Sequence, residues 1–360
     1  MYIKDLALMN FRNYENARIT FSDGINILYG DNAQGKTNIL EAIYVAGTTK
    51  SHRGSKDREM IRFGQEESHI RTDIRKDGMN RRIDMHLKKN KTKGIAIDLV
   101  PIHRSSELLG TMNMVFFSPE DLTIIKNSPV ERRNFMDMEL CQLDKIYVSE
   151  LAGYKKVLDQ RNNLLRQISF DKSKLDMLSV WNDQLVKYGI EKRNHFIDLL
   201  NEIIPDIHKN LTSGKEKLTL VYEKNVETES FLSMLDEKQE SDIKNQTTQT
   251  GPHRDDIIFL VNDMDVRRFG SQGQQRTVAL SLKLAEIKLV KKIINDNPIL
   301  LLDDVMSELD RSRQDALLDS IKEIQTILTC TGYDDFIKER LKINKVYKVT
   351  AGTIEEKTLC

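Results

Sequence analysis

Three features of the sequence predict an α/β fold whose two halves are separated by a large insertion. A glycine-rich loop lies between a short apolar run and a helical pattern near the N-terminus. An aliphatic run that ends in two aspartates lies near the other end of the chain. The long segment between them carries apolar residues at helical spacing. We therefore expect a head built from both chain ends, with a helical lobe inserted into it.

The first feature is the segment Gly30–Thr37, which matches the pattern G-x-x-x-x-G-K-[ST]. The apolar run 25–29 before it predicts a buried strand, and the pattern over 37–47 predicts a helix. In this context backbone N–H groups and the helix N-terminus form an anion site. We expect Lys36 to contact the β- and γ-phosphates of a nucleoside triphosphate and Thr37 to bind Mg²⁺. The alternative is a chance glycine turn, against which the flanking strand and helix argue.

The second feature is the strand pattern over 298–304, which ends in Asp303 and Asp304. It is typical of a Walker B strand, in which Asp303 would hold Mg²⁺ through water and Asp304 would polarise the attacking water. An aliphatic run ending in aspartate is common, but here the spacing is informative. Asp303 lies 267 residues after Lys36. So wide a gap predicts a large insertion into the nucleotide domain.

A third motif, Ser271–Arg276, lies about one helix before this strand, and 30 residues separate Gly273 from Asp303. The spacing of apolar residues over 277–294 predicts the helix that follows. A serine and a glycine at a helix N-terminus form a second anion site, which one chain does not need for one triphosphate. In ABC-type ATPases such a site faces the γ-phosphate held by a partner subunit, and 307–310 matches the D-loop at that seam. The alternative is an ordinary N-capped helix.

At this point the chain resembles the RecF family of recombination mediators, which are SMC-like ABC ATPases. The segment Asn10–Tyr14 is similar to the N-terminal motif of SMC-like ATPases. Four further motifs look like hallmarks of the RecF family: Ser51–Arg53, Phe117–Leu122, Arg132-Arg133 with Phe135 and Asp137, and Gly251–Asp256. The resemblance runs from Met1 to about Gly332.

The resemblance implies a weak DNA-dependent ATPase that dimerises on ATP and helps load recombinase at single-strand gaps. It implies ATP and Mg²⁺ as cofactors, and RecR, RecO and DNA (duplex and single-strand/duplex junctions) as partners. The head would span 1–115 and 245–360, and the helical arm 116–244. The candidate catalytic residues are Lys36, Asp303 and Asp304, and the candidate metal ligands are Thr37 and Asp303. The candidate nucleotide-binding residues are Arg12, Asn13, Gly30, Asn32, Gly35, Lys36, Thr37, Asn38, Ser271, Gly273 and Gln274.

Three departures from the wider ABC class favour slow hydrolysis. The segment 117–121 contains no Q-loop glutamine, and 327–332 contains no switch histidine. Asp304 stands where glutamate is more usual, so its shorter side chain reaches the water less well. No chemical role is predicted for His253 or Arg254 beyond membership of the family motif.

The 55 basic and 55 acidic residues give a net charge of +0, so a DNA-binding protein of this composition needs local patches. One candidate lies between Arg71 and Lys93, where nine basic and three acidic residues give a local net charge of +6. Turn residues at 76–78 and 89–91 predict hairpins in this segment. The patch is interpreted either as a surface that contacts phosphates or as the solvated face of a sheet.

The remaining segments set limits on the class of protein. The stretch 132–211 predicts amphipathic helices, and 227–250 predicts a polar, partly mobile linker that returns to the head. Three widely spaced cysteines, no membrane-length apolar run and no signal peptide favour a cytoplasmic protein. The alternatives are the ATPase subunit of a membrane ABC transporter and, less well supported, a metabolic P-loop kinase. The kinase would have no use for the motif at Ser271.

Overall fold

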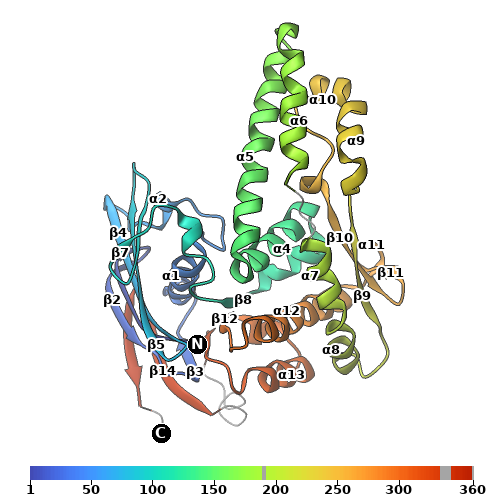
Figure 1. Cartoon of the computed structure of the whole chain (residues 1–360). Helices are drawn as coiled ribbons and strands as arrows, with labels where there is room; N and C mark the ends of the chain where they lie inside the picture. The colour runs from blue at the N-terminus through green and yellow to red at the C-terminus, as the bar shows by residue number, and fades with distance from the viewer. Residues whose placement is uncertain (189–191, 333–341, 359–360) are drawn as a thin grey trace. The chain divides into compact units, whose positions relative to one another are not determined.

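The structure, a computed structural model, describes residues 1–188, 192–332 and 342–358. The chain forms two compact units, Met1–Leu122 with Leu280–Cys360, and Thr123–Ala279. The first unit is built from both ends of the chain and the second is one continuous insertion (Figure 1). This division differs from the predicted one, because residues 245–279 pack with the insertion. Their strand β10 (Asp256–Val261) pairs along its length with β9 (Leu218–Glu223), which lies within the insertion.

The first unit contains a six-stranded sheet in which five neighbouring strands are parallel. The order is β15-β14-β3-β13-β12-β8, and only β15 runs antiparallel. The bounds are Thr353–Lys357, Ile343–Thr350, Ile25–Tyr29, Thr326–Cys330, Ile299–Asp303 and Met114–Phe117 in that order. The predicted strands β3 and β12 lie near the middle of this sheet and are buried. Because the carboxyl ends of parallel strands share one edge, the loops after β3 and β12 lie at the same edge.

A second six-stranded sheet in the first unit is antiparallel, in the order β2-β1-β4-β5-β6-β7. Its strands are Tyr14–Thr20, Tyr2–Phe11, Glu67–Lys76, Met79–Lys88, Gly94–Ile97 and Val100–Pro101 in that order. The predicted hairpin turn at 76–78 is confirmed, with Asp77 and Gly78 at positive φ. Buried and exposed residues alternate along β4, so one face of this sheet is covered and the other meets solvent.

Helix α1 (Lys36–Thr48) shares one buried core with both sheets of the first unit. Ile39, Leu40 and Ile43 lie at helical spacing and are fully buried in this core. This packing fixes the N-terminus of α1 at the end of β3. The other helical segments of the first unit are α2 (Asp57–Met60), η1 (Ser105–Glu107), η2 (Pro119–Asp121), η6 (Val305–Glu308) and α13 (Arg311–Ile321).

The second unit is mainly helical, as the periodicity over 132–211 predicts. Its longest helix, α5 (Lys145–Ile168), has 24 residues and buries Leu151, Tyr154 and Val157. Among the described residues from 129 to 211, the helical segments are α4 (Pro129–Leu143), α5, η3 (Lys172–Met177), α6 (Leu178–Val186), α7 (Lys192–Asn201) and α8 (Ile204–Leu211). Helix α3 (Leu122–Lys126) lies at the boundary, and α12 (Gln272–Ile294) carries the chain back to the first unit.

Residues 227–250 are not the partly mobile linker that their polar composition predicts. They form η4 (Thr228–Ser230), α9 (Phe231–Glu237) and α10 (Gln239–Asn245). Asp242 of α10 is fully buried and accepts a hydrogen bond from the buried Arg161 of α5 at 2.8 Å. The segment is packed through the buried Phe231 and Leu235 of α9, and the ion pair with Arg161 allows the charge of Asp242 to be buried as well. The segments η5 (Pro252–Arg254), β10, β11 (Met264–Asp265) and α11 (Val266–Phe269) complete the unit.

Among the residues that the structure describes, no helix has both the length and the apolar character needed to cross a membrane.

Candidate nucleotide site

The loop between β3 and α1 has the backbone that its glycines predict. Gly35 has φ 115°, and a Cβ there would lie 2.6 Å from Asn13 Nδ2 and 2.8 Å from the Tyr14 hydroxyl. A Cβ on Gly30 would lie 2.3 Å from the Val349 carbonyl oxygen. A side chain at either position would therefore clash with the surrounding chain. The loop closes tightly enough for its N–H groups and the N-terminus of α1 to converge on an anion.

Lys36 and Thr37, the residues predicted to contact phosphate and Mg²⁺, are the first residues of α1. Lys36 is buried, and its Nζ donates to the carbonyl oxygens of Gly30 at 2.7 Å and Asp31 at 3.0 Å. The Lys36 ammonium group therefore lies inside the glycine-rich loop. The Thr37 hydroxyl donates to Asp303 Oδ1 at 2.9 Å, which joins the two predicted metal ligands across 266 residues of chain.

This pair of oxygens is suited to holding a magnesium ion. The Thr37 hydroxyl would bind Mg²⁺ directly, and Asp303, which accepts the hydrogen bond of that hydroxyl, would hold the ion through water. Asp303 is buried, and burial raises the pKa of its carboxyl; the charge of Asp304 adds to this, whereas the hydroxyls of Thr329 and Thr37 act in the opposite direction. A nearby cation would offset the cost of ionising this buried carboxyl.

Thr329 of β13 contacts both predicted aspartates and was not singled out in the sequence analysis. It lies directly opposite Asp303 in the parallel register of β12 and β13. Its hydroxyl donates to Asp303 Oδ1 at 2.8 Å and accepts from the Asp304 backbone N–H at 2.9 Å. Asp304 itself has φ 50° and ψ 20°, a conformation uncommon for residues other than glycine. Thr329 therefore holds both aspartates, and pairing the two predicted strands could have identified it.

Arg12 and Asn13, predicted to bind nucleotide, lie beside the loop and have different partners. Asn13 Nδ2 donates to the Gln34 carbonyl at 2.9 Å, and Asn13 Oδ1 accepts from Asn38 Nδ2 at 2.8 Å. Arg12 donates instead to both carboxylate oxygens of Glu41, at 2.7 and 2.6 Å. Asn13 and Asn38 thus brace the loop, whereas Arg12 holds α1. Asn32 is exposed at the tip of the loop.

Glu41 is the centre of this arrangement and was not predicted. It is fully buried one turn beyond Thr37, and Ser51 also donates to it at 2.6 Å. Burial opposes its ionisation, but the hydrogen bonds from Arg12 and Ser51 outweigh this and lower the pKa of Glu41. Arg53 lies 3.8 Å from the same carboxylate. The N-terminal motif and the Ser51–Arg53 motif therefore converge on one residue of the P-loop helix.

The turn between β14 and β15 also contacts the glycine loop. The Gln34 side chain accepts from the Ala351 N–H at 2.6 Å, and the Gln34 carbonyl accepts from the Gly352 N–H at 3.2 Å. Gly352 has φ 78°, and a Cβ there would lie 2.6 Å from the Asn13 carbonyl oxygen. The C-terminal hairpin therefore forms one wall of the candidate site, through backbone contacts that leave no pattern in the sequence.

The third motif begins α12 and belongs to the second unit. Ser271 Oγ accepts from the Gln274 N–H at 3.2 Å, and Gln274 Oε1 accepts from the Ser271 N–H at 2.8 Å. These reciprocal bonds are those of a capping box, and Gly273 lies exposed between the two residues. The motif therefore caps the helix, as the alternative interpretation predicts. A capped N-terminus is still an anion site, so a role opposite a partner's γ-phosphate stays a prediction.

Comparison with known proteins decides the family. The chain matches a family model described as RecF/RecN/SMC N terminal domain over residues 2–355. It is 60% identical over 359 residues to the DNA replication and repair protein RecF of Lachnoclostridium phytofermentans, across 99% of this chain and 100% of that protein. The chain belongs to the RecF family. The ATPase subunit of a transporter and the metabolic kinase are thereby set aside.

Further similarities agree with this RecF assignment. The RecF protein of Clostridium perfringens strain 13 is 44% identical over 363 residues, across 99% of this chain and 100% of that protein. A solved structure described as the recombination mediator protein RecF-ATP in the RecFOR pathway is 34% identical, with a TM-score of 0.93 and coverage of 99% and 98%. An SMC head domain from Pyrococcus yayanosii, 15% identical with a TM-score of 0.60 and coverage of 100% and 97%, shares the fold alone. The predicted ABC-type head fold is confirmed.

Several RecF-family motifs of the second unit contact one another or its buried core. Arg132 donates to both carboxylate oxygens of Asp256, at 2.6 and 3.0 Å. Asp137 accepts from the buried Arg193 at 2.8 Å. His253 Nδ1 lies 2.6 Å from the Tyr154 hydroxyl, and its Nε2 lies 2.9 Å from the Thr248 carbonyl. All of these contacts except that between His253 and Thr248 join segments distant in sequence, so these motif residues stabilise the fold of the second unit.

These contacts define the protonation state of His253. Because a carbonyl only accepts, Nε2 carries the proton, and Nδ1 accepts from Tyr154. Burial lowers the pKa of His253 to about 4, and the positive charges of Arg254, Arg133 and Arg161 add to this, while the Thr248 carbonyl opposes it. The neutral ring is therefore the form that fits the folded unit.

We expect the second unit to lose stability as the pH falls from about 6.5 toward 4. In that window the unfolded His253 binds a proton that the folded one does not, which favours unfolding by up to about 2 kcal/mol at about pH 5. His253→Gln should flatten this dependence. The only tryptophan of the chain, Trp181, lies in α6, so its fluorescence during urea unfolding at pH 7.5 and 5 reports on this unit. The exposed His103 provides the control, His103→Gln. Equal pH dependence in wild type and His253→Gln would contradict the assignment.

The basic segment between Arg71 and Lys93 is less positive in space than along the sequence. Arg71 and Arg82 both pair with Asp84, at 3.1 and 2.6 Å. Arg81, Lys89 and Lys93 pair with Asp98, Glu66 and Asp57, all outside the segment, at 2.7, 3.0 and 2.9 Å. Five of the nine cations thus have carboxylate partners. The charges favour the solvated sheet face over a phosphate-binding surface.

Proposed function

We propose that this chain is an ATP-dependent DNA-binding protein of recombinational repair. It binds ATP with Mg²⁺, dimerises on ATP, and helps load recombinase at single-strand gaps. Slow hydrolysis of ATP then releases the DNA. The observation that carries this proposal is the Thr37–Asp303 oxygen pair beside the buried Lys36, in a chain that belongs to the RecF family.

Different residues of the first unit would contact the phosphates, the magnesium ion and the attacking water. The loop N–H groups between Gly30 and Thr37 and the Lys36 ammonium bind the β- and γ-phosphates, as electrostatic stabilisation of phosphoryl transfer requires. The Thr37 hydroxyl and the Asp303 carboxylate hold Mg²⁺, which supplies positive charge to the phosphate oxygens. Asp304, which directly follows β12 and precedes η6, would orient the attacking water.

Slow turnover follows from the geometry of Asp304. Its side chain is one methylene shorter than glutamate, and Thr329 holds its backbone in a left-handed conformation. The carboxylate therefore has little freedom to move toward a water. We expect an ATPase whose bound state is long-lived compared with that of a metabolic kinase.

The dimer and the partners complete the proposal. Ser271, Gly273 and Gln274 would meet the γ-phosphate bound by a second copy, so that ATP joins two heads. The helical second unit would serve as the arm, and DNA would be held mainly through its backbone. RecR and RecO are the proposed protein partners, in the cytoplasm. Since five of the nine basic residues between Arg71 and Lys93 already have carboxylate partners, we do not assign the DNA contact to this segment.

The experiment that tests this function is ATP turnover with and without DNA. We expect a low basal rate that rises several-fold with gapped duplex, and binding of that DNA that requires ATP and weakens steeply with salt. Each phosphate contact should contribute about −0.9 to the slope of log K against log salt. Lys36→Met sets the background from contaminating ATPases. A rate of ATP turnover that DNA does not change, together with DNA binding that does not require ATP, would contradict the proposal.

A further inference from the structure

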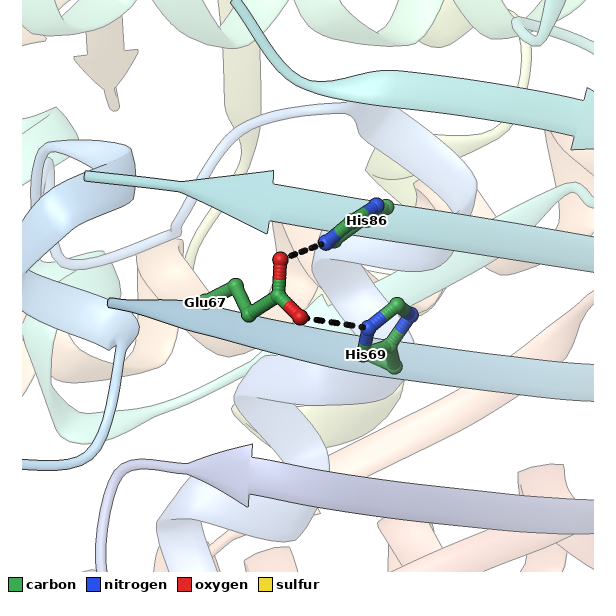
Figure 2. Close-up of side chains that lie close together, drawn as sticks. All are labelled: Glu67, His69 and His86. Carbon is green, nitrogen blue, oxygen red and sulfur yellow. Dashed lines mark hydrogen bonds and ion pairs between the residues drawn. The ribbon is translucent and has the colours of Figure 1, made fainter. Parts of the chain in front are cut away.

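The outer face of the antiparallel sheet carries a cluster that the nucleotide site does not use. His69 of β4 and His86 of β5 lie directly opposite each other in the antiparallel register. Glu67 lies two residues before His69 and therefore projects from the same face. The three side chains meet on this face, where the Glu67 carboxylate lies beside both imidazole rings and each of its oxygens faces one ring nitrogen (Figure 2).

The distances among these side chains are close to those of a metal site. His86 Nε2 lies 2.9 Å from Glu67 Oε2, and His69 Nε2 lies 3.9 Å from Glu67 Oε1. One ligand atom from each residue lies within 4.8 Å of the other two. Tetrahedral zinc, with bonds of about 2.0–2.2 Å, separates its ligand atoms by roughly 3.4 Å. Because a metal ion binds in the plane of an imidazole ring, the two partly buried, stacked rings would turn toward the ion, which would bring the separations of 2.9 and 3.9 Å closer to that value.

The state of the rings also suits a metal. They stack with centroids 3.9 Å apart and planes 23° apart, so two positive charges here would repel each other. A neutral imidazole with a free nitrogen lone pair is the form that binds metal.

The cluster also has room for further ligands. His69 and His86 line a shallow hollow of about 770 Å³, whose other lining residues include Ala7, Ala17, Ala96 and Met9. Small side chains across the neighbouring strands leave this face of the cluster open. A water molecule, or a ligand atom from outside the chain, can therefore occupy a fourth position, as it does in metal sites with three protein ligands.

We propose that Glu67, His69 and His86 bind a divalent first-row transition-metal ion, with Zn²⁺ as the first candidate. Two imidazoles and one carboxylate suit Zn²⁺, Ni²⁺, Co²⁺ or Fe²⁺, whereas Mg²⁺ and Ca²⁺ prefer sites made only of oxygen. The ion is therefore distinct from the Mg²⁺ of the nucleotide site. Lys88 lies opposite Glu67 and repels a cation, so we expect micromolar affinity. A bound ion would join β4 to β5 beyond their hydrogen bonds.

The test is a titration of the full, tag-free chain with ZnCl₂ in competition with a chromophoric chelator. It is done without nucleotide, because ATP binds metal, in a Cys360→Ser background that removes one competing thiol. We expect His69→Ala and His86→Ala each to weaken Zn²⁺ binding at least about tenfold, because even an outer-shell partner typically contributes 10–100-fold. The exposed His103→Ala is the matched control and should bind as the parent does.

Two further readouts keep the result interpretable. Zn²⁺ should raise the melting temperature of the parent and of His103→Ala, but not that of the two site variants. Glu67→Gln keeps the shape of the side chain and should also weaken binding, which covers the case in which a histidine variant fails to fold. Lys36→Met should keep full Zn²⁺ affinity, so the proposal stands or falls independently of the ATPase function. No Zn²⁺ binding, or equal binding in parent and site variants, would overturn it.

Discussion

Lys36→Met is expected to abolish ATP binding, with a loss in affinity on the order of 100-fold or more. The Lys36 ammonium lies within the curl of the loop, where it makes two hydrogen bonds to carbonyls at 2.7 and 3.0 Å. A charge-assisted contact with phosphate is worth about 3 kcal/mol, which corresponds to that change in affinity. Methionine fills nearly the same volume without charge, so the loop should keep its shape. Calorimetric titration with ATP measures the effect.

Asp303→Asn is the matched comparison, because it should keep nucleotide binding and remove turnover. An asparagine oxygen can still accept from Thr37 and Thr329, so the local hydrogen bonds survive. What is lost is the negative charge that holds Mg²⁺. We expect ATP affinity within a few-fold of the parent and hydrolysis at background. Unchanged affinity in Lys36→Met would refute the P-loop assignment, whatever Asp303→Asn does.

Ser271→Arg should bind ATP about as well as wild type but remain monomeric and hydrolyse ATP poorly. Lys36 and Thr37 are not changed by this substitution, so we expect the chain's own loop to keep its shape. The arginine places a bulky cation where a small hydroxyl and backbone amides would approach a partner's γ-phosphate. Sedimentation with a slowly hydrolysed ATP analogue measures dimer formation directly.

The control for Ser271→Arg is Ser271→Ala, which removes the cap without adding bulk. Loss of the Gln274 N–H bond to Ser271 Oγ should cost about 1 kcal/mol of helix stability in both variants. Ser271→Ala should therefore still dimerise to a measurable extent. A normal ATP-dependent dimer in Ser271→Arg would refute the two-headed mechanism. Loss of ATP binding would instead mean that the motif serves the chain's own nucleotide pocket.

Secondary structure was predicted correctly where the sequence pattern that determines it lies within one short segment. The strand 25–29, the glycine loop and the helix after it follow from local periodicity and from the backbone freedom of Gly30 and Gly35. The same holds for the strand ending at Asp303 and for the Asp77-Gly78 turn. In each case neighbouring residues determine the conformation, so a window of the sequence is sufficient.

The sequence was less informative where residues outside a segment pair with its charges. A count of charges between Arg71 and Lys93 cannot include Glu66, Asp57 or Asp98, which neutralise three of the cations in space. The polar composition of 227–250 conceals Asp242, which is buried because Arg161 lies against it. The polar composition of a segment predicts that it is exposed only if its polar groups have no partners elsewhere in the fold.

The sequence by itself determined the fold class, the glycine-rich loop with its flanking strand and helix, the strand that ends at Asp303, and the family, because these depend on local patterns and spacing. Only the tertiary structure revealed that Glu41 joins two motifs, that Thr329 holds Asp303 and Asp304, and that the turn at 351–352 contacts the loop. It alone brought Glu67 within reach of His86. These contacts join residues from 10 to 317 positions apart. Their partners are selected by burial and by the pairing of strands, which no single segment of the chain contains.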